Sequence, residues 1–242
     1  MKIQVIAIFY NAEQTIKRCL DSILSQEVGD NLLEIIAIDD FSRDDTCSLL
    51  EQYSDARVKK VFHKVNKGIS AARNSGLQLV DGDCFYLIDG DDYLPPNALA
   101  TLLKHWENDV DWVQGSYRVV SPNGDEKMIN GKLDGHYCSH TEIESHFNQI
   151  EFIYTHNRLV NAKWSAVMFV EGEVHEDRFW NVEVFPRLQK IITISEPTYN
   201  YVSSNASFSG KSRSSKQYMK SAIHLMPLVS TKNLDGYIKF NN

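Results

Sequence analysis

Three aspartates follow a hydrophobic segment in the stretch CFYLIDGDDYLPP, residues 84–96. Asp89, Asp91 and Asp92 lie so close together that their carboxylates repel one another, which is costly at a buried strand end unless positive charge compensates. An Asp-x-Asp pair offers hard oxygen ligands suited to an octahedral ion such as Mg²⁺ or Mn²⁺. Gly90 would let the backbone approach a ligand closely. The stretch therefore predicts a divalent metal site.

Other uses of this acidic string fit less well. An EF-hand loop needs a further carboxylate and a glycine where Tyr93 and Leu94 stand. A phosphoryl-aspartate hydrolase of the DxDx[TV] type would carry Thr or Val in place of Asp92. A solvated acidic turn is the structural alternative, because adjacent aspartates are common in turns.

The elements that must position these aspartates alternate in type. Strands are expected at 2–9, 32–39, 58–64 and 83–89. Apolar residues at helical spacing follow each strand, and Ser42 with Asp45 indicates a capping box at the start of the second helix. Pro95 and Pro96 suit the first turn of the fourth helix. This alternation predicts an α/β fold with a mainly parallel sheet flanked by helices.

The second half is less regular. A strand is expected at 112–121, a turn at 121–125, a short helix from Thr141 and a late strand at 191–203. Residues 177–189 look helical, but Pro186 should break that helix. Residues 212–229 have an amphipathic helical pattern.

In a parallel α/β sheet, ligands bind outside the carboxyl ends of the strands. The polar groups that follow the four predicted strands should therefore face one space. They are Tyr10-Asn11, Asp39-Asp40, Asn66-Lys67-Gly68 and Asp89-Gly90-Asp91-Asp92.

Composition narrows the class of protein. The 242 residues are 43% hydrophobic and 24% charged, as expected of a globular protein, and the net charge of -7 argues against nucleic acid as a partner. The four cysteines form no CxxC pair, so they predict neither a zinc site nor a disulfide framework. No apolar run is long enough to span a bilayer, and the N-terminus has no signal-peptide pattern, so a cytoplasmic protein is expected.

Four motifs together resemble a known family. VIAIFYNAEQTIKRCLDSILSQ, LEIIAIDDFSRDDT, NKGISAARNSGL and CFYLIDGDDYLPPNAL are similar, in order and spacing, to the N-terminal half of family-two nucleotide-sugar glycosyltransferases with the GT-A fold. The resemblance is dense over residues 2–110, and VHEDRFWNVEVF (174–185) is similar to the family's Glu-Asp motif.

The resemblance implies an inverting transferase that moves a sugar from a nucleoside diphosphate to an acceptor hydroxyl on a glycan or lipid-linked saccharide, assisted by Mn²⁺ or Mg²⁺. It divides the chain into a nucleotide-sugar-binding half (1–110), an acceptor-binding half (111–210) and a helical tail (211–242). A non-catalytic nucleotide-sugar-binding or partner-binding module with the same fold is the alternative.

The resemblance also assigns the donor site. Asp40 would accept the ring N–H of the base, which favours UDP, while Phe9, Tyr10 and Asn11 would flank that base. Asp91 would bind the metal, and Asp89 with Gly90 would lie near the ribose or sugar.

Lys67, Arg73 and Asp39 each have a structural interpretation besides contact with the donor. Lys67 and Arg73 would neutralise phosphate, with a solvated surface position as the alternative for each. Asp39 is interpreted as capping the helix that begins near Ser42.

Asp177 matches the catalytic base, which would remove the proton of the acceptor hydroxyl. Glu176 and Asp177 as favourable acids at a helix start are the alternative. One departure from the family is Phe41, because the family often carries glycine there.

A basic stretch in the tail, Lys211, Arg213, Lys216 and Lys220, predicts peripheral contact with the inner face of a membrane. A helix packed on the domain is the alternative for the same segment.

Overall fold

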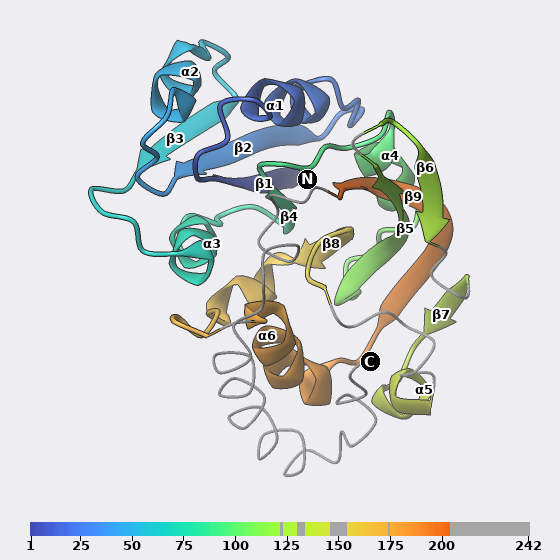
Figure 1. Ribbon diagram of the computed structural model, residues 1–242. Helices are drawn as coiled ribbons and strands as arrows, with labels where there is room; N and C mark the ends of the chain where they lie inside the picture. Colours follow the sequence, from blue (N-terminus) through green and yellow to red (C-terminus); the bar gives the residue numbers. More distant parts are fainter. Residues whose placement is uncertain (122, 130–133, 146–153, 174, 204–242) are drawn as a thin grey trace.

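The computed structural model describes residues 1–121, 123–129, 134–145, 154–173 and 175–203 (Figure 1). A nine-stranded sheet has the order β3-β2-β1-β4-β8-β5-β9-β7, and β6 pairs with β5. The sheet runs without interruption through both halves of the chain. The predicted tail helix and its basic stretch lie outside the described residues.

The first half forms as the sequence predicts. Its strands are β1 (Lys2–Phe9), β2 (Leu32–Asp39), β3 (Val58–Phe62) and β4 (Cys84–Asp89), and every pair among them is parallel. The helices are α1 (Ile16–Leu24), α2 (Thr46–Gln52), α3 (Ile69–Leu77) and α4 (Ala98–Leu103).

The second half departs from a parallel sheet. Its strands are β5 (Trp112–Val120), β6 (Glu126–Ile129), β7 (Gly135–Tyr137), β8 (Arg158–Asn161) and β9 (Ile191–Val202). β8 runs antiparallel to both β4 and β5, while β5 and β9 are parallel. The strand β8 therefore joins the two halves with its direction reversed.

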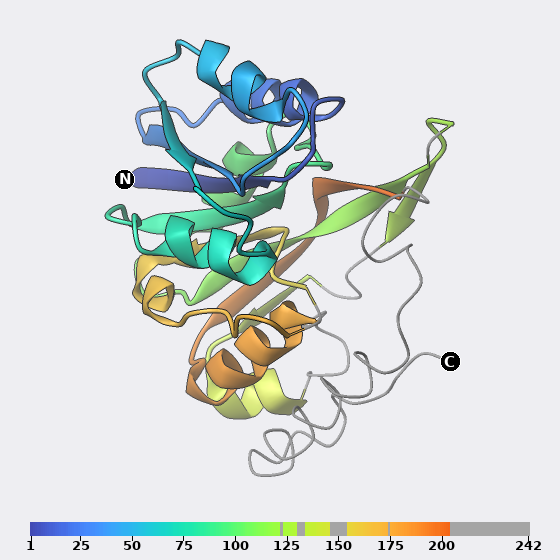
Figure 2. The same ribbon diagram turned by 60° about the vertical axis from the view of Figure 1, so that its left-hand side comes forward.

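Helices cover both faces of the sheet (Figures 1 and 2). On β1, Val5 and Ala7 pack into a core with α1, α2 and α4, whereas Ile6 and Ile8 pack into a second core with α3 and α6 (Glu176–Val184). This alternation follows from the two-residue period of a strand. A short helix α5 (His140–Ser145) contributes Ile143 to the second core.

Three helix predictions have clear outcomes. The break at Pro186 is confirmed, since α6 ends at Val184 and a 3₁₀ turn, η2 (Phe185–Arg187), follows. The capping box at Ser42 is wrong, because α2 begins at Thr46. The prolines 95 and 96 precede α4 rather than forming its first turn, because that helix begins at Ala98.

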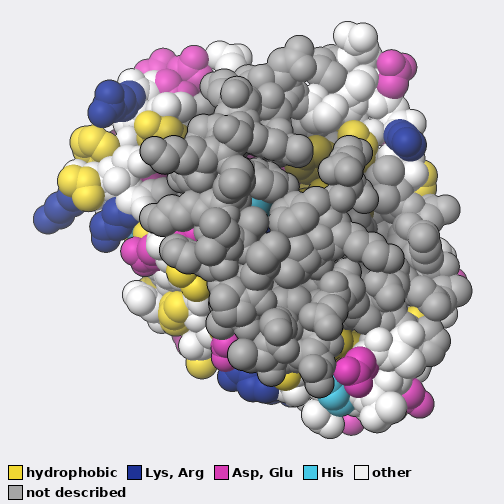
Figure 3. Space-filling model, turned by 60° about the horizontal axis from the view of Figure 1, so that its bottom comes forward, with side chains coloured by type: hydrophobic (Ala, Val, Ile, Leu, Met, Phe, Trp, Pro, Cys, Tyr) yellow, Lys and Arg dark blue, Asp and Glu magenta, His cyan; other side chains and the backbone are white. Residues whose placement is uncertain are grey.

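Within the described ranges, no helix is long and apolar enough to cross a bilayer. Figure 3 shows exposed hydrophobic side chains at several separate places on one face.

Asp111 closes the junction between β5 and the chain before β9. It is fully buried, and its carboxylate accepts hydrogen bonds from Trp164 Nε1, on the 3₁₀ turn η1 (Ala162–Ala166), at 3.1 Å and from the backbone N of Gln189 and Lys190 at 2.6 and 2.9 Å. Lys163 Nζ, 2.6 Å away, supplies the opposite charge.

We therefore expect Asp111→Ala to lower the free energy of unfolding by about 2–4 kcal/mol. The substitution removes the acceptor of Trp164 Nε1 and of two backbone N–H groups, and it removes the partner of the Lys163 ammonium group. Urea unfolding would measure this loss. Asp109→Ala is the control, since Asp109 is exposed and should change stability by less than about 1 kcal/mol. Equal effects of the two substitutions would contradict this role of Asp111.

Candidate active site

The carboxyl ends of β1, β2 and β4 lie side by side. Phe9 on β1 pairs with Asp39 on β2, and Ile8 on β1 pairs with Asp89 on β4. The polar residues that follow these three strands are therefore neighbours at one edge of the sheet.

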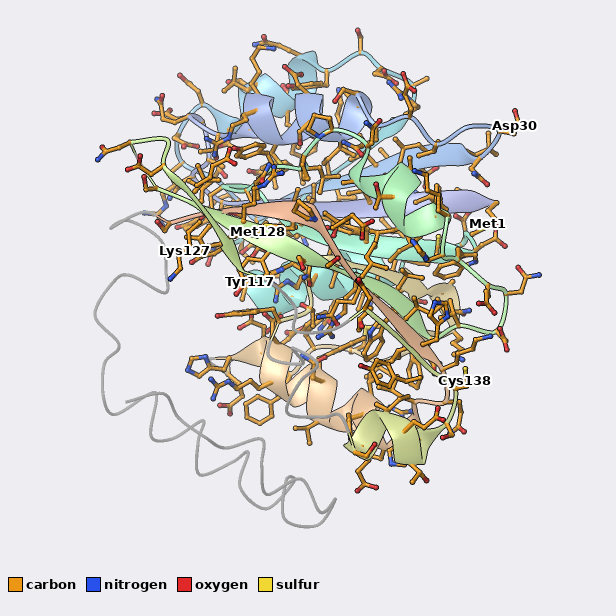
Figure 4. All side chains as sticks on the ribbon, turned by 90° about the vertical axis from the view of Figure 1, so that its right-hand side faces the viewer. Met1, Asp30, Tyr117, Lys127, Met128 and Cys138 are labelled. Atoms are coloured by element: carbon orange, nitrogen blue, oxygen red, sulfur yellow. The ribbon has the colours of Figure 1, made fainter. Side chains whose placement is uncertain are left out.

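Figure 4 shows the orientation of this edge. Met1 and Asp30 mark the end of the molecule where β1 and β2 begin, whereas Tyr117, Lys127 and Met128 on the β5–β6 pair lie toward the opposite end. Tyr117 is thus on the side to which the parallel strands point.

The chain turns outward after β1. Phe9 is buried, Tyr10 is 48% exposed, and Asn11 has a left-handed backbone with φ 50°. The backbone N of Asn11 donates to Ser42 Oγ at 2.9 Å, and Asn11 Oδ1 accepts from the backbone N of Arg43 at 2.9 Å. These bonds join the ends of β1 and β2 and leave the Tyr10 ring at the surface.

Asp40 organises the loop between β3 and α3. Its Oδ1 lies 2.6 Å from His63 Nδ1 and accepts from Lys67 N at 3.0 Å, while its Oδ2 accepts from Asn66 Nδ2 at 2.9 Å and Gly68 N at 2.8 Å. A carboxylate has about four acceptor positions. An incoming base N–H would therefore need one of these four partners to move away.

The side chain of Lys67 is exposed, so only its backbone takes part in this network.

Asp39 is buried, and its Oδ2 accepts from Ser42 N at 3.2 Å, but the turn that it closes precedes α2 by several residues. Asp39 Oδ1 is buried without a hydrogen-bond partner among the described residues.

Phe41 follows Asp40 in the segment between β2 and α2. It is 42% exposed and has φ 63°, a left-handed conformation. For a bulky residue this conformation costs about 1–3 kcal/mol. The glycine that the family often carries here would adopt it without strain.

Gly90 is fixed by packing within the protein. A Cβ atom there would lie 2.6 Å from the backbone O of Ile8 and would overlap the ring of Phe9. Glycine thus lets the loop after β4 pack directly against the end of β1.

The surroundings of Asp91 favour the protonated form of its carboxyl group. Burial, and next the negative charge of Asp89, raise the pKa of Asp91 to about 6. Arg18 Nη2 donates to the backbone O of Asp91 at 2.7 Å. A divalent cation at this carboxylate would relieve the repulsion.

Both carboxylate oxygens of Asp92 accept hydrogen bonds from β9. It is fully buried, Oδ2 accepts from Tyr199 Oη at 2.5 Å and Oδ1 accepts from Val202 N at 2.7 Å. Burial, with the charges of Asp91 and Asp89, raises the pKa of Asp92 well above its usual range. Asp92 therefore ties the acidic loop to β9.

Arg73 supplies positive charge to Asp89, the first aspartate of the acidic string, and to two acidic residues of α6. Its side chain is buried, Nη2 donates to Asp89 Oδ1 at 3.0 Å, and Nη1 donates to Glu176 Oε1 at 2.6 Å and Asp177 Oδ1 at 2.7 Å. Burial alone would lower the pKa of Arg73, but the charges of Asp177, Asp89 and Glu176 raise it well above its usual value. The solvated position considered for Arg73 is wrong.

Glu176 and Asp177 form the first turn of α6, where negative charge is favourable. Burial raises the pKa of Glu176 to about 7, and the nearby Arg73 opposes that rise. Asp177 Oδ1 also accepts from Thr155 Oγ1 at 2.6 Å. Two donors thus fix one oxygen of the Asp177 carboxylate.

An aromatic column of Tyr117, Tyr154, His156 and Tyr199 adjoins Thr155 through its sequence neighbour His156. The His156 ring stacks on Tyr199 with a centroid distance of 4.4 Å and on Tyr154 with one of 4.8 Å. Tyr117 meets the edge of His156 at 5.5 Å. Burial lowers the pKa of His156 to about 4, so the ring is neutral at pH 7. The column connects the partly exposed Tyr154 to the residue that bonds Asp92.

Some contributors to the site escape sequence reasoning. Thr155 and His156 precede β8, and no pattern in the sequence predicts that antiparallel strand. His63 could have been found, because it directly follows β3 and strand ends face the site. The sequence prediction places His63 inside a strand that extends to residue 64, whereas β3 ends at Phe62 and His63 is the first residue after it.

Comparisons with known proteins identify the family of this chain. A family model described as "Glycosyl transferase family 2" matches residues 4–169. The chain is 28% identical over 212 residues to the glycosyltransferase EpsJ of Bacillus subtilis, which covers 82% of this chain and 60% of that relative.

A match to an Escherichia coli protein is shorter. UDP-Glc:alpha-D-GlcNAc-diphosphoundecaprenol beta-1,3-glucosyltransferase WfgD is 30% identical over 122 residues, which is 50% of this chain and 47% of that protein. The chain thus spans less than two thirds of the length of both relatives.

Among solved structures, S. aureus TarS 1-349 in complex with UDP-GlcNAc matches with a TM-score of 0.80 at 19% identity, over 96% of this chain and 66% of that one. With the family match, this likeness establishes the GT-A fold.

The Arg73 cluster generates a stability prediction. We expect Arg73→Gln to lower the free energy of unfolding by about 3–5 kcal/mol at pH 8, because three carboxylates lose their shared cation. Adding Glu176→Gln should recover part of that loss, since it removes one of the repelling charges, and urea unfolding of both single variants and the double variant would measure the coupling.

Arg187→Gln is the matched control, because Arg187 forms an exposed pair with Glu183 on the protein surface and should contribute less than about 1 kcal/mol. A loss for Arg73→Gln no larger than that of the control, or strict additivity with Glu176→Gln, would rule out the charge cluster as a stabilising unit.

Proposed function

Because the chain belongs to glycosyl transferase family 2, we propose that it transfers a sugar, with inversion, from a UDP-sugar to a hydroxyl group of a glycan or lipid-linked saccharide. The observation that carries this proposal is the bridge made by Arg73. It joins Asp89, after the donor-side strand β4, to Asp177 on α6. The carboxylate proposed to lie near the donor sugar and the carboxylate proposed to take the acceptor's proton would therefore share one site.

The donor side rests on the strand ends. Tyr10 would meet the base of UDP, and Asp40 would accept its ring N–H or hold the loop that surrounds it. Lys67, exposed at the end of that loop, would neutralise phosphate. The complex of TarS with UDP-GlcNAc and the UDP-glucose named for WfgD support a UDP-sugar as the donor class.

The acidic loop fits a divalent ion, such as Mn²⁺ or Mg²⁺, that is held mainly by its substrate. No group of three or more metal-ligating side chains occurs within the described residues. Proteins often bind Mg²⁺ through one or two carboxylates, with water and substrate phosphates completing the shell. Asp91 is the carboxylate available for this role, and the bound ion would neutralise charge on the departing diphosphate.

Asp177 would act as the general base. Arg73 and Thr155 both donate to its Oδ1, so Oδ2 is the oxygen that would take the proton of the acceptor hydroxyl. As that proton leaves, the acceptor oxygen forms a bond to the anomeric carbon, the bond from that carbon to the diphosphate breaks, and UDP departs.

The acceptor would bind over the half from 111 to 210, next to the aromatic column. The name of WfgD, which acts on a sugar linked to diphosphoundecaprenol, supports a lipid-linked saccharide as one acceptor class. An enzyme that uses such an acceptor would work at the inner face of a membrane, where the sequence predicts peripheral contact.

Substitution of the base separates a transferase from a binding module. We expect Asp177→Asn to lower kcat about 10²–10⁴-fold, because the amide cannot take the proton, and to leave the Kd for UDP within about twofold. UDP release from a panel of UDP-sugars with glycan acceptors would measure the first value, and calorimetry the second.

Glu183→Gln, an exposed substitution on the same helix, is the control and should leave both values unchanged. Transfer that persists at the normal rate in Asp177→Asn would exclude Asp177 as the base. UDP binding without transfer by the natural protein for any donor would favour the binding module.

The acidic loop predicts a pH-dependent affinity for Mn²⁺. Because the pKa of Asp91 is raised to about 6, this carboxylate binds a proton below pH 6 and must lose it to bind the cation. The affinity for Mn²⁺ should therefore fall about tenfold per pH unit below pH 6 and reach a plateau above it.

Titration of Mn²⁺ in the presence of UDP-glucose would test this. UDP-glucose is a diester of diphosphate, so its phosphate groups have no proton that titrates near pH 6. Asp91→Asn should show weak binding without this pH dependence. An affinity that is the same at pH 5 and pH 8 would contradict the assignment of Asp91 as a ligand.

A further inference from the structure

Phe41 has an unusual backbone at a functional position. It follows Asp40 and adopts φ 63°, where the Cβ of an L residue crowds the neighbouring carbonyl oxygen. Four other non-glycine residues of the described chain share this conformation, and all are asparagine or histidine, which tolerate it better: Asn11, Asn97, Asn157 and His175. Phe41 is the bulky hydrophobic exception.

The loop holds Phe41 from both sides. Before it, the backbone N of Asp40 donates to Phe9 O at 2.9 Å, which continues the β1–β2 pairing. After it, the backbone N of Ser42 donates to Asp39 Oδ2 at 3.2 Å. The fold therefore requires the left-handed turn, and glycine would form it without strain.

Packing explains only part of the choice of phenylalanine there. The residue is 42% exposed, so a large part of its surface is left open to a ligand. Strained residues in such loops occur at ligand clamps, where a contact with the ligand offsets the strain.

The position of Phe41 indicates that ligand. Tyr10, 48% exposed, follows β1, and Phe41 follows the neighbouring strand β2 by two residues. Two exposed aromatic rings at adjacent strand ends suit a flat, weakly polar ring.

We propose that Phe41 binds the uracil ring of the donor through its aromatic side chain. This inference rests on the proposed function and adds a residue that the family resemblance does not supply. Every base has an aromatic face, so the contact increases affinity without choosing the base, and the choice of base stays with hydrogen-bonding groups.

Substitutions that separate the ring from the backbone test the proposal. We expect Phe41→Gly and Phe41→Asn, both compatible with the left-handed turn, to raise the Kd for UDP about tenfold or more, as loss of a base–aromatic stack does. Phe41→Tyr, which keeps the ring, should stay within about twofold of the natural protein. The urea midpoint of Phe41→Gly should match or exceed that of the natural protein, because strain is relieved.

Asn97→Gly is the control, since it places glycine at a left-handed position just before α4, in another loop, and should leave the Kd unchanged. In NMR spectra, H5 and H6 of bound UDP should show smaller ring-current shifts with Phe41→Gly than with the natural protein.

Two results would overturn the proposal: unchanged Kd values for Phe41→Gly and Phe41→Asn, or a loss for Phe41→Tyr equal to theirs. Either result, with normal UDP binding by the natural protein, leaves the proposed function intact. A natural protein that fails to bind UDP would overturn the UDP-sugar donor and the role of Phe41 together.

Discussion

The site depends on one buried cation shared by three carboxylates. Arg73 projects from α3 and meets Asp89 from the end of β4 and Glu176 with Asp177 from the start of α6. A guanidinium suits this role because it carries several donors in one plane and stays charged when buried. Without it, these three carboxylates would repel one another at such short separations.

The sheet makes that meeting possible. Parallel pairing brings the ends of β1, β2 and β4 to one edge, and the reversed strand β8 brings Thr155 and His156 to the same region. Asp92 then ties the acidic loop to β9 through Tyr199. The carboxylates of one short string thus differ in their contacts: Asp89 pairs with Arg73, Asp92 fixes the loop to β9, and Asp91 is the one proposed to bind the metal ion.

The sequence predicts the first half of the fold well because β1, β2 and β4 are mainly apolar runs with polar ends, and α1 has a clear apolar stripe. It also predicts that Asp40, Asp89 and Asp177 belong to one site. Local patterns do not predict which partner each group finds. The four bonds to Asp40 and the pairing of Arg73 arise from contacts between residues far apart in the chain. The strand β8 is too short to show a period, so the aromatic column beside it could not be predicted.

The most direct test of the account is a crystal structure with UDP-glucose and Mn²⁺ bound. Asp91 should bind the metal, and the anomeric carbon should lie about 5–6 Å from Asp177 Oδ2, which leaves room for one attacking hydroxyl group between them. A sugar bound far from Asp177, or a metal bound away from Asp91, would contradict the account.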